Sequence, residues 1–223
     1  MYAADAPLIT IIDDDDSIRD AVSDLLASVG IEAVSYGSPR EALAAQTPDR
    51  PGCFILDVRM PGGSGLDMQR QIGAERGHGK PIIFLTAHGD IPMTVQAMKA
   101  GAVDFLTKPF RDQTLLDAVA IGIERDRSRR KAAHVCDRYL ERFATLTPRE
   151  REVMQHVAQG MLNKQIAYAL GISEVTVKLH RGNVMSKMKL TSVGELIRAW
   201  EVIAPCLPKT EAAGPAELAR RTH

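Results

Sequence analysis

The chain has little cysteine, few aromatic side chains and no long apolar run. Its three cysteines, Cys53, Cys136 and Cys206, are far apart and fit neither a zinc-ligand spacing nor a disulfide framework. We therefore expect buried or inert thiols in a reducing compartment. No apolar stretch approaches the roughly 20 residues of a membrane span, and the first residues lack the basic and apolar regions of a signal peptide. These absences predict a cytoplasmic protein that does not associate with membranes.

An excess of charge of one sign is also missing, but the balance hides a division along the chain. The 28 basic and 28 acidic residues cancel. Residues 1–122 hold 10 basic and 17 acidic residues, whereas 123–144 hold 7 and 4, and 145–204 hold 8 and 5. Opposite charge in the two halves indicates two modules with different partners, and only the C-terminal one has the sign that a polyanion prefers.

The N-terminal part of the chain alternates short apolar runs with helical patterns. The runs lie near residues 9–12, 33–36, 53–56, 82–85 and 103–107. Five strands and five helices in strict alternation predict a doubly wound α/β fold with a five-stranded parallel sheet. We place this domain at residues 1–122.

The remainder of the chain has a helical pattern up to residue 203. No proline or glycine interrupts residues 123–144, which are rich in arginine, so we predict that the fifth helix continues as a charged linker helix. An unfolded basic linker is the alternative. Helical patterns at 148–160, 163–170, 174–188 and 192–203 then predict an all-α, four-helix domain over residues 145–203. The composition of residues 204–223 predicts a disordered tail.

Polar residues stand at the ends of four of the predicted strands. Asp13 and Asp14 follow the first strand, Asp57 the third, Thr86 the fourth and Lys108 the fifth. Because the binding crevice of a parallel sheet lies beyond the carboxyl ends of its strands, these side chains should meet at one rim. Such a rim could hold a phosphoryl group and a cation such as Mg²⁺, which prefers carboxylate oxygens. Without a cation the carboxylates would repel one another.

This part of the chain resembles the receiver domain of bacterial two-component response regulators, which is CheY-like. The resemblance rests on Ile12-Asp13-Asp14, Leu56-Asp57-Val58-Arg59-Met60-Pro61, Leu85-Thr86-Ala87 and Thr107-Lys108-Pro109-Phe110, in family order over about 115 residues. It implies that Asp57 accepts a phosphoryl group from a sensor histidine kinase, with Thr86 and Lys108 contacting its oxygens. It also implies Mg²⁺ held by Asp14, Asp57 and the backbone carbonyl of Arg59, with Asp13 acting through a water or orienting its neighbour. The Lys108–Pro109 bond should be cis.

The same resemblance implies a conformational switch. Phosphorylation adds negative charge at Asp57, so Thr86 would move toward it and leave space for the Phe105 ring to turn inward. Phe105 stands where the family often has tyrosine, so no phenolic hydroxyl can report the state. A plain core role for Phe105 is the alternative. Phosphorylation would promote a homodimer through the fourth helix, fifth strand and fifth helix.

Two predicted helices of the C-terminal domain meet at Gly171-Ile172-Ser173, which indicates a helix-turn-helix whose second helix enters the major groove. The run from Leu146 to Arg181 resembles the LuxR-type DNA-binding domain. Together with the receiver, it makes the chain similar to the NarL/FixJ family of response regulators, in its FixJ-like branch. Promoter DNA and RNA polymerase are the expected partners. A small helical bundle that binds only protein is the alternative.

Helical spacing divides the predicted recognition helix into two faces. Val177, Val184 and Met188 should pack inward. On the other face, Lys178 is the candidate for a guanine edge and Leu179 for a thymine methyl group. Contacts to phosphates, which position the protein without reading sequence, are expected from Asn163, Lys164, Thr176, His180, Arg181 and Lys187. A core or helix-surface role is the alternative for His180.

Two rival functions fit parts of the chain. A phosphohydrolase of the haloacid-dehalogenase type also uses an aspartate beyond a strand, but it needs an acidic pair after its lysine, where this chain has Pro109-Phe110. A module that senses a small ligand would need an apolar pocket, for which the sequence gives no signal. We therefore expect a DNA-binding regulator whose only chemistry is phosphoryl acceptance and slow self-dephosphorylation. The sequence does not select the kinase, the operator, activation or repression, the dimer face, or a closed or extended unphosphorylated form.

Overall fold

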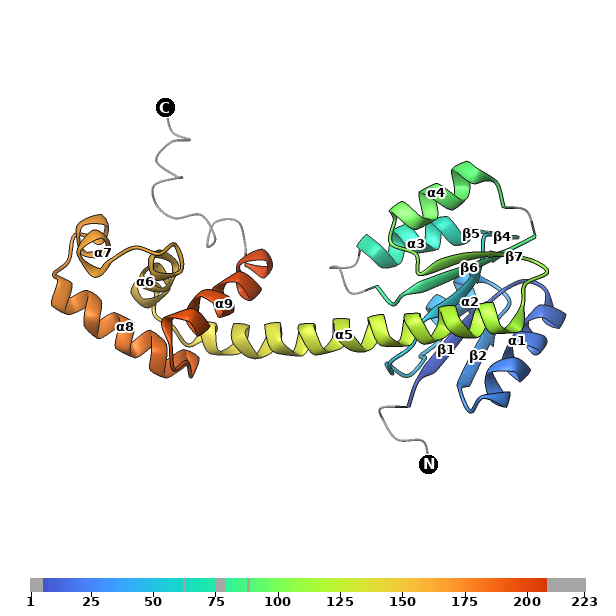
Figure 1. Ribbon diagram of the computed structural model, residues 1–223, viewed down its shortest axis with the longest axis horizontal. Helices are drawn as coiled ribbons and strands as arrows, with labels where there is room; N and C mark the ends of the chain where they lie inside the picture. Colours follow the sequence, from blue (N-terminus) through green and yellow to red (C-terminus); the bar gives the residue numbers. More distant parts are fainter. Residues whose placement is uncertain (1–5, 62, 75–78, 88, 208–223) are drawn as a thin grey trace. The chain divides into compact units, whose positions relative to one another are not determined.

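The computed structural model describes residues 6–61, 63–74, 79–87 and 89–207. The chain divides into two compact units, residues 1–131 and 132–223, and helix α5 (Asp112–Ala144) contributes to both (Figure 1). Because α5 is continuous over 33 residues, the predicted linker is helical and the unfolded alternative is excluded. Every helix within the described residues is too short or too polar to span a membrane.

The first unit contains a five-stranded parallel sheet in the order β2-β1-β3-β6-β7, which confirms the predicted doubly wound fold. An antiparallel pair of two-residue strands, β4 and β5, follows β3 and was not predicted. The elements are β1 (Leu8–Ile12), α1 (Asp16–Ser28), β2 (Glu32–Tyr36), α2 (Pro39–Ala44), β3 (Phe54–Asp57), β4 (Arg59–Met60), β5 (Gly63–Ser64), α3 (Gly65–Ala74), β6 (Ile82–Thr86), α4 (Ile91–Lys99) and β7 (Asp104–Thr107).

Helices cover both faces of this sheet, because successive side chains of a strand point to opposite faces. Ile55 of β3 packs with residues of α1 and α5 in one core, whereas its neighbour Leu56 packs with residues of α3 and α4 in the other. The central strands β1, β3 and β6 are therefore buried on both sides, as is typical of parallel sheets, whereas the edge strand β2 is only partly buried.

A buried carboxylate attaches α5 to the amino-terminal edge of the sheet, just before β3. Asp126 is wholly buried and accepts a hydrogen bond from the backbone N–H of Gly52 at 3.0 Å. Arg129 and Arg130 form ion pairs with it at 2.6 and 2.8 Å. A charge taken out of water needs such partners, so this part of the predicted linker belongs to the first unit.

The second unit packs four helices and the end of α5 around one core. They are α6 (Pro148–Ala158), α7 (Asn163–Leu170), α8 (Glu174–Met188) and α9 (Val193–Ile203), followed by a 3₁₀ turn, η1 (Ala204–Cys206). Thr147 and Glu150 form a capping box at the start of α6. Gly171 ends α7 at a φ of +65°, a left-handed conformation that favours glycine. The four helices agree with the predicted ranges.

The structure corrects the predicted start of the disordered tail and shows that the three thiols differ in exposure. Residues 204–206 are helical, so the predicted disordered tail does not begin at 204, and residues 208–223 lie outside the described part. Cys53 is buried as expected, but Cys136 is partly exposed and Cys206 exposed. Positions 136 and 206 are far apart in sequence, and only the packing of α9 against α5 brings them to one surface.

Candidate phosphoacceptor site and nucleic-acid interface

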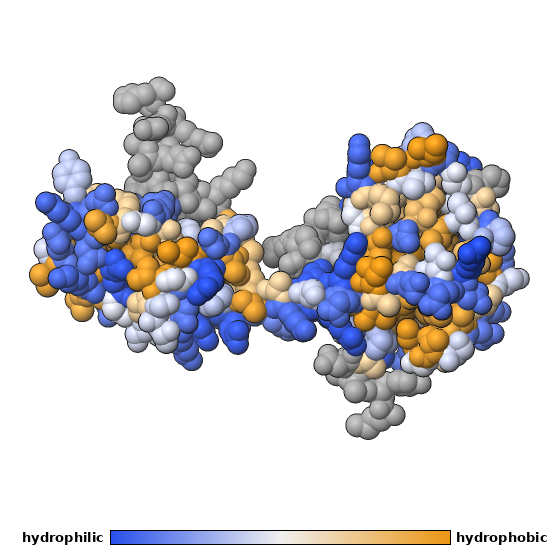
Figure 2. Space-filling view, viewed as in Figure 1, coloured by the Kyte–Doolittle hydropathy of each residue, from blue (hydrophilic) through white to orange (hydrophobic). Residues whose placement is uncertain are grey.

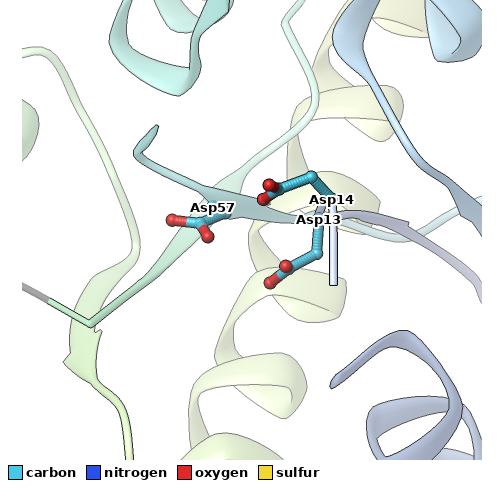
Figure 3. A group of neighbouring side chains, drawn as sticks. All are labelled: Asp13, Asp14 and Asp57. Carbon is cyan, nitrogen blue, oxygen red and sulfur yellow. The ribbon is translucent and has the colours of Figure 1, made fainter. Parts of the chain in front are cut away.

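The predicted polar residues do meet at the carboxyl edge of the sheet. Asp13 and Asp14 directly follow β1, Asp57 is the last residue of β3, Thr86 ends β6 and Lys108 follows β7. Figure 3 shows the three aspartates grouped at the ends of β1 and β3, and one carboxylate oxygen from each lies within 4.8 Å of the others. Three hard oxygen donors at this separation suit a divalent cation such as Mg²⁺.

Lys108 lies between two of these carboxylates. Its Nζ donates to Oδ2 of Asp13 at 2.6 Å and to Oδ2 of Asp57 at 3.0 Å. Burial by itself would lower the pKa of Lys108, but its hydrogen bonds to the two aspartates outweigh this effect and raise that pKa. Burial raises the pKa of Asp13 although Lys108 opposes the shift. Lys108 therefore carries its charge wherever the site operates, and its ammonium offsets the crowded negative charge.

Asp13 and Asp14 are adjacent in sequence but differ in exposure. Asp13 is 1% exposed, its Oδ1 accepts the Asp15 amide at 3.0 Å, and Arg19 donates to its backbone carbonyl at 2.6 Å. Asp14 is exposed. Asp13 is thus fixed by protein groups, whereas Asp14 faces solvent. The sequence did not predict that Arg19 contacts Asp13, although its place in the first turn of α1 keeps it close to the end of β1.

The Asp57 carboxylate is oriented from two sides. It is 8% exposed, and its Oδ1 accepts a hydrogen bond from the backbone N–H of Arg59 at 3.2 Å while Oδ2 accepts from Lys108. Arg59 also pairs with Ser64 in the short β4–β5 ladder. This unpredicted pair holds the backbone of Arg59 next to Asp57, where its carbonyl was expected to act as a ligand.

Thr86 and Phe105, the two residues of the expected switch, both lie next to Gly89. Thr86 is buried, and its carbonyl accepts the Lys108 amide at 2.7 Å. A Cβ placed on Gly89 would lie 3.2 Å from Cε1 of Phe105 and 3.7 Å from the methyl group of Thr86. The Phe105 ring is half-buried with its centroid 6.0 Å from that of Phe84. The Lys108–Pro109 bond is cis, as predicted.

In the second unit, the two faces of α8 are separated as the helical spacing indicated. Val177, Val184 and Met188 are fully buried. Lys178 is exposed and Leu179 is 63% exposed, so both are available to a partner in a groove. Ser173 caps the helix by accepting the Thr176 amide at 3.1 Å, and the hydroxyls of the two residues are 2.9 Å apart.

The side chains expected to contact phosphates fall into two groups. Lys164 is exposed, but three others are engaged within the protein. Arg181 donates to Oδ1 of Asn163 at 2.8 Å, and Lys187 donates to Oε2 of Glu150 at 2.6 Å. A phosphate contact through Arg181 or Lys187 would have to share these bonds. The structural importance of Glu150 was missed, although Thr147 followed by glutamate three residues later is the sequence signal of a capping box.

His180, also expected to contact a phosphate, lies partly in the interior of the second unit. The residue is half-buried, and its Nδ1 is buried with no hydrogen-bond partner among the described residues. One side of the ring therefore belongs to the interior of the second unit. The ring is only partly available to a ligand, in line with the core alternative.

Both units match known protein families. Residues 9–120 match the response regulator receiver domain, and residues 144–200 match the bacterial regulatory proteins of the luxR family. The receiver match carries the acidic site, and the luxR match carries the predicted helix-turn-helix. Neither match is to a phosphohydrolase.

Individual relatives span nearly the whole chain. Nodulation protein W of Bradyrhizobium diazoefficiens is 50% identical over 94% of this chain and 92% of its own length. Among solved structures, the response regulator StyR matches with a TM-score of 0.71 at 45% identity, over 88% of this chain and 98% of its own. Full-length FixJ from B. japonicum matches with a TM-score of 0.52 at 38% identity, over 90% of this chain and 98% of its own. The order of the two units is thus shared with these proteins.

Proposed function

Since the chain belongs to the FixJ-like response regulators of the NarL/FixJ family, we propose that phosphorylation of Asp57 controls its binding to promoter DNA. The family joins a phosphoacceptor unit to a DNA-binding unit, and a two-component system couples them to a sensor histidine kinase. The observation that carries the proposal is the position of Asp57, held at the strand edge by Lys108 and next to two further carboxylates.

The chemistry is transfer of a phosphoryl group between two side chains. A carboxylate oxygen of Asp57 attacks the phosphorus of the kinase phosphohistidine, the P–N bond breaks and the imidazole leaves, which gives an acyl phosphate. Lys108 is already 3.0 Å from Asp57 and pairs with an oxygen of the incoming group, while Thr86 donates its hydroxyl to another. The protein then hydrolyses this anhydride slowly and catalyses no other turnover.

Mg²⁺ is the proposed cation of this site. Asp14, Asp57 and the backbone carbonyl of Arg59 would hold it, and Asp13 would act through a water. When bound, the cation neutralises phosphoryl oxygens that three carboxylates would otherwise repel. The exposure of Asp14 and the separation of the three carboxylates support this assignment.

Dimerisation is the proposed output of the receiver. Movement of Thr86 toward the phosphoryl group would vacate space into which the Phe105 ring turns. The segment after β6 would carry the change to α4. Helix α4 exposes Ile91, Val95 and Met98, which are 81%, 44% and 43% accessible, and Figure 2 shows apolar residues on the surface over this helix. An apolar surface beside the switch suits a contact that forms only after phosphorylation.

The dimer would place two copies of α8 on DNA. Lys178 and Leu179 would read base edges, whereas Lys164 and Thr176 would contact phosphates, with His180, Asn163, Arg181 and Lys187 at the margin of the interface. Half-sites should be about 10 bp apart or a multiple of it. Each copy offers few basic groups, so DNA affinity depends on dimerisation. Contact with RNA polymerase would follow DNA binding.

The test compares three full-length proteins after incubation with Mg²⁺ and acetyl phosphate. Intact mass should show one phosphoryl group on the wild type and on the control Asp20→Asn, which alters an exposed aspartate of α1, but none on Asp57→Asn. Sedimentation should show a shift to dimer, and gel shift tighter DNA binding, in the same two proteins. An adduct that survives Asp57→Asn, or phosphorylation without any change in association or DNA binding, would contradict the proposal.

A further inference from the structure

Two cysteines that are 70 residues apart in sequence lie side by side in the second unit. Cys136 is in the second half of α5, and Cys206 is the last residue of η1, just after α9. Their Sγ atoms are 3.2 Å apart, closer than an ordinary van der Waals contact between sulfurs. Both thiols also approach the backbone carbonyl of Val202, at 3.8 and 3.9 Å. The two sulfurs are therefore within reach of each other without a change in the fold.

The third cysteine is an internal comparison. Cys53, directly before β3, is wholly buried, and a Cβ on Gly122 would lie 3.0 Å from its sulfur. Burial raises the pKa of its thiol to about 12. In contrast, Cys206 is exposed and Cys136 partly so. A soluble oxidant reaches the pair but not Cys53, because susceptibility of a thiol follows its exposure and thiolate character.

We propose that Cys136 and Cys206 form a redox modification site that closes to an intramolecular disulfide when the protein meets a hydroperoxide. This inference concerns the second unit alone and does not rest on the proposed phosphorylation of Asp57. Reversible disulfides in reducing compartments are more often redox devices than permanent staples.

The reaction balances with the peroxide as the two-electron oxidant. The exposed Cys206 thiol gives up its proton, and its sulfur attacks one oxygen of hydrogen peroxide. The O–O bond breaks, the sulfur keeps one oxygen as a sulfenic acid, and the leaving hydroxide takes up the proton to form water. Cys136 Sγ then attacks the sulfenic sulfur, the S–O bond breaks, and a second water leaves with the proton of Cys136. Burial, followed by the hydrogen bond with Cys206, raises the pKa of Cys136 to about 11, so the more exposed Cys206 is the thiol that meets the peroxide first.

The disulfide would tie the end of α9 to α5. The last turns of α5 already pack in the core of the second unit through Phe143, and Arg142 donates to the Met188 carbonyl at 2.9 Å. A bond between positions 136 and 206 would enclose helices α6 to α9 in one covalent loop. Closing such a long loop removes conformations from the unfolded chain, so oxidation should stabilise this unit in particular.

The test oxidises the full-length protein, reduced and then freed of reductant, with a slight excess of hydrogen peroxide. Intact mass should fall by two hydrogens, and peptide mapping should find one linkage, between positions 136 and 206, in a monomeric chain. The unfolding midpoint followed by the fluorescence of Trp200, the sole tryptophan, should rise by about 10 °C and return on reduction.

Three variants complete the experiment. Cys136→Ser and Cys206→Ser should abolish the linkage, whereas Cys53→Ser should form it as the wild type does. Disulfide-linked dimers through Cys206, sulfinic acid on Cys206 beside a free Cys136, or an unreactive pair would each overturn the proposal. The wild-type result decides the question even where a variant folds poorly.

Discussion

The two units use charge in opposite ways. At the acidic site of the first unit, the groups that would do the chemistry are withdrawn from water and held by protein contacts, as Asp13, Asp57 and Lys108 are. In the second unit, the side chains that would read DNA project into solvent, as Lys178 and Leu179 do. There the ion pair between buried Glu150 and partly exposed Lys187 joins two helices. Phosphoryl transfer needs charges that are preorganised before the substrate arrives, whereas base readout needs side chains that are still unsatisfied.

Removal of the ammonium from the acidic site should have the largest effect. In Lys108→Met, Asp13 and Asp57 lose their shared cation, so we expect the free energy of unfolding of the first unit to fall by about 2–4 kcal/mol without divalent cation. Added Mg²⁺ should restore part of this loss. Urea unfolding followed by circular dichroism, with EDTA or with Mg²⁺, measures both.

The matched change in the second unit tests the comparison itself. Lys178→Met removes the same charge from an exposed position, so the free energy of unfolding should change by no more than about 0.5 kcal/mol. Equal losses of unfolding free energy in Lys108→Met and Lys178→Met would show that burial of the lysine does not explain the difference between the two sites.

Neutralising Glu150 should have the next largest effect. Glu150→Gln keeps an acceptor for the Thr147 amide but loses the charge partner of Lys187, so we expect a loss of about 1–2 kcal/mol from the second unit at neutral pH. The value is modest because Lys187, whose side chain is 37% exposed, can regain water. Trp200 fluorescence during urea unfolding measures it, with the more exposed Glu152→Gln as control.

The difference in stability between the wild type and Glu150→Gln should disappear at acidic pH. Burial would raise the pKa of Glu150, but the hydrogen bonds from Lys187 and Thr147 dominate and lower it from its ordinary value of 4.5. The ionised form therefore stabilises the folded state above pH 4.5, and this contribution disappears as the pH falls through the lowered pKa. A wild type and variant that differ equally at all pH values would contradict this account.

Two lysines of the second unit should separate base reading from phosphate contact. Lys178→Ala should weaken binding by about 1–3 kcal/mol at operators that contain the guanine contacted by Lys178. At operators in which that guanine is replaced, the substitution should change binding little. Lys164→Ala should weaken all sequences alike and reduce the salt slope by about 1. Gel shifts over an operator matrix at several salt concentrations measure both, and the reverse pattern would exchange the two assignments.

A small gain in stability is expected from a substitution at Gly182. It lies four residues after Lys178 on the exposed face of α8, and a Cβ there would meet nothing within 4 Å. Gly182→Ala should therefore stabilise the second unit by about 0.5–1 kcal/mol. We expect a modest loss of DNA affinity, because the methyl group points to the face that approaches the groove. Tighter DNA binding would show that the glycine does not serve close approach.

Much of the fold followed from local patterns in the sequence. The five apolar runs and the helices between them predicted the parallel sheet, whose central strands β1 and β6 are buried on both faces. The lack of helix breakers in residues 123–144 predicted a continuous α5. The acidic site was equally predictable, because parallel strands end at one edge. The short β4–β5 pair escaped prediction because two-residue strands have no periodicity.

The sequence by itself determined which residues reach the strand edge and which face of α8 is apolar, because these depend on periods of two and 3.6 residues. Tertiary structure alone decided which polar groups find partners. It paired Lys187 with Glu150 rather than leaving it in solvent, buried Asp126 within an apparently exposed linker, and brought Cys136 to Cys206. Lys187 with Glu150, Asp126 with Gly52 and Cys136 with Cys206 each join residues that are far apart in the sequence. Spacing along one helix or strand carries no information about such neighbours.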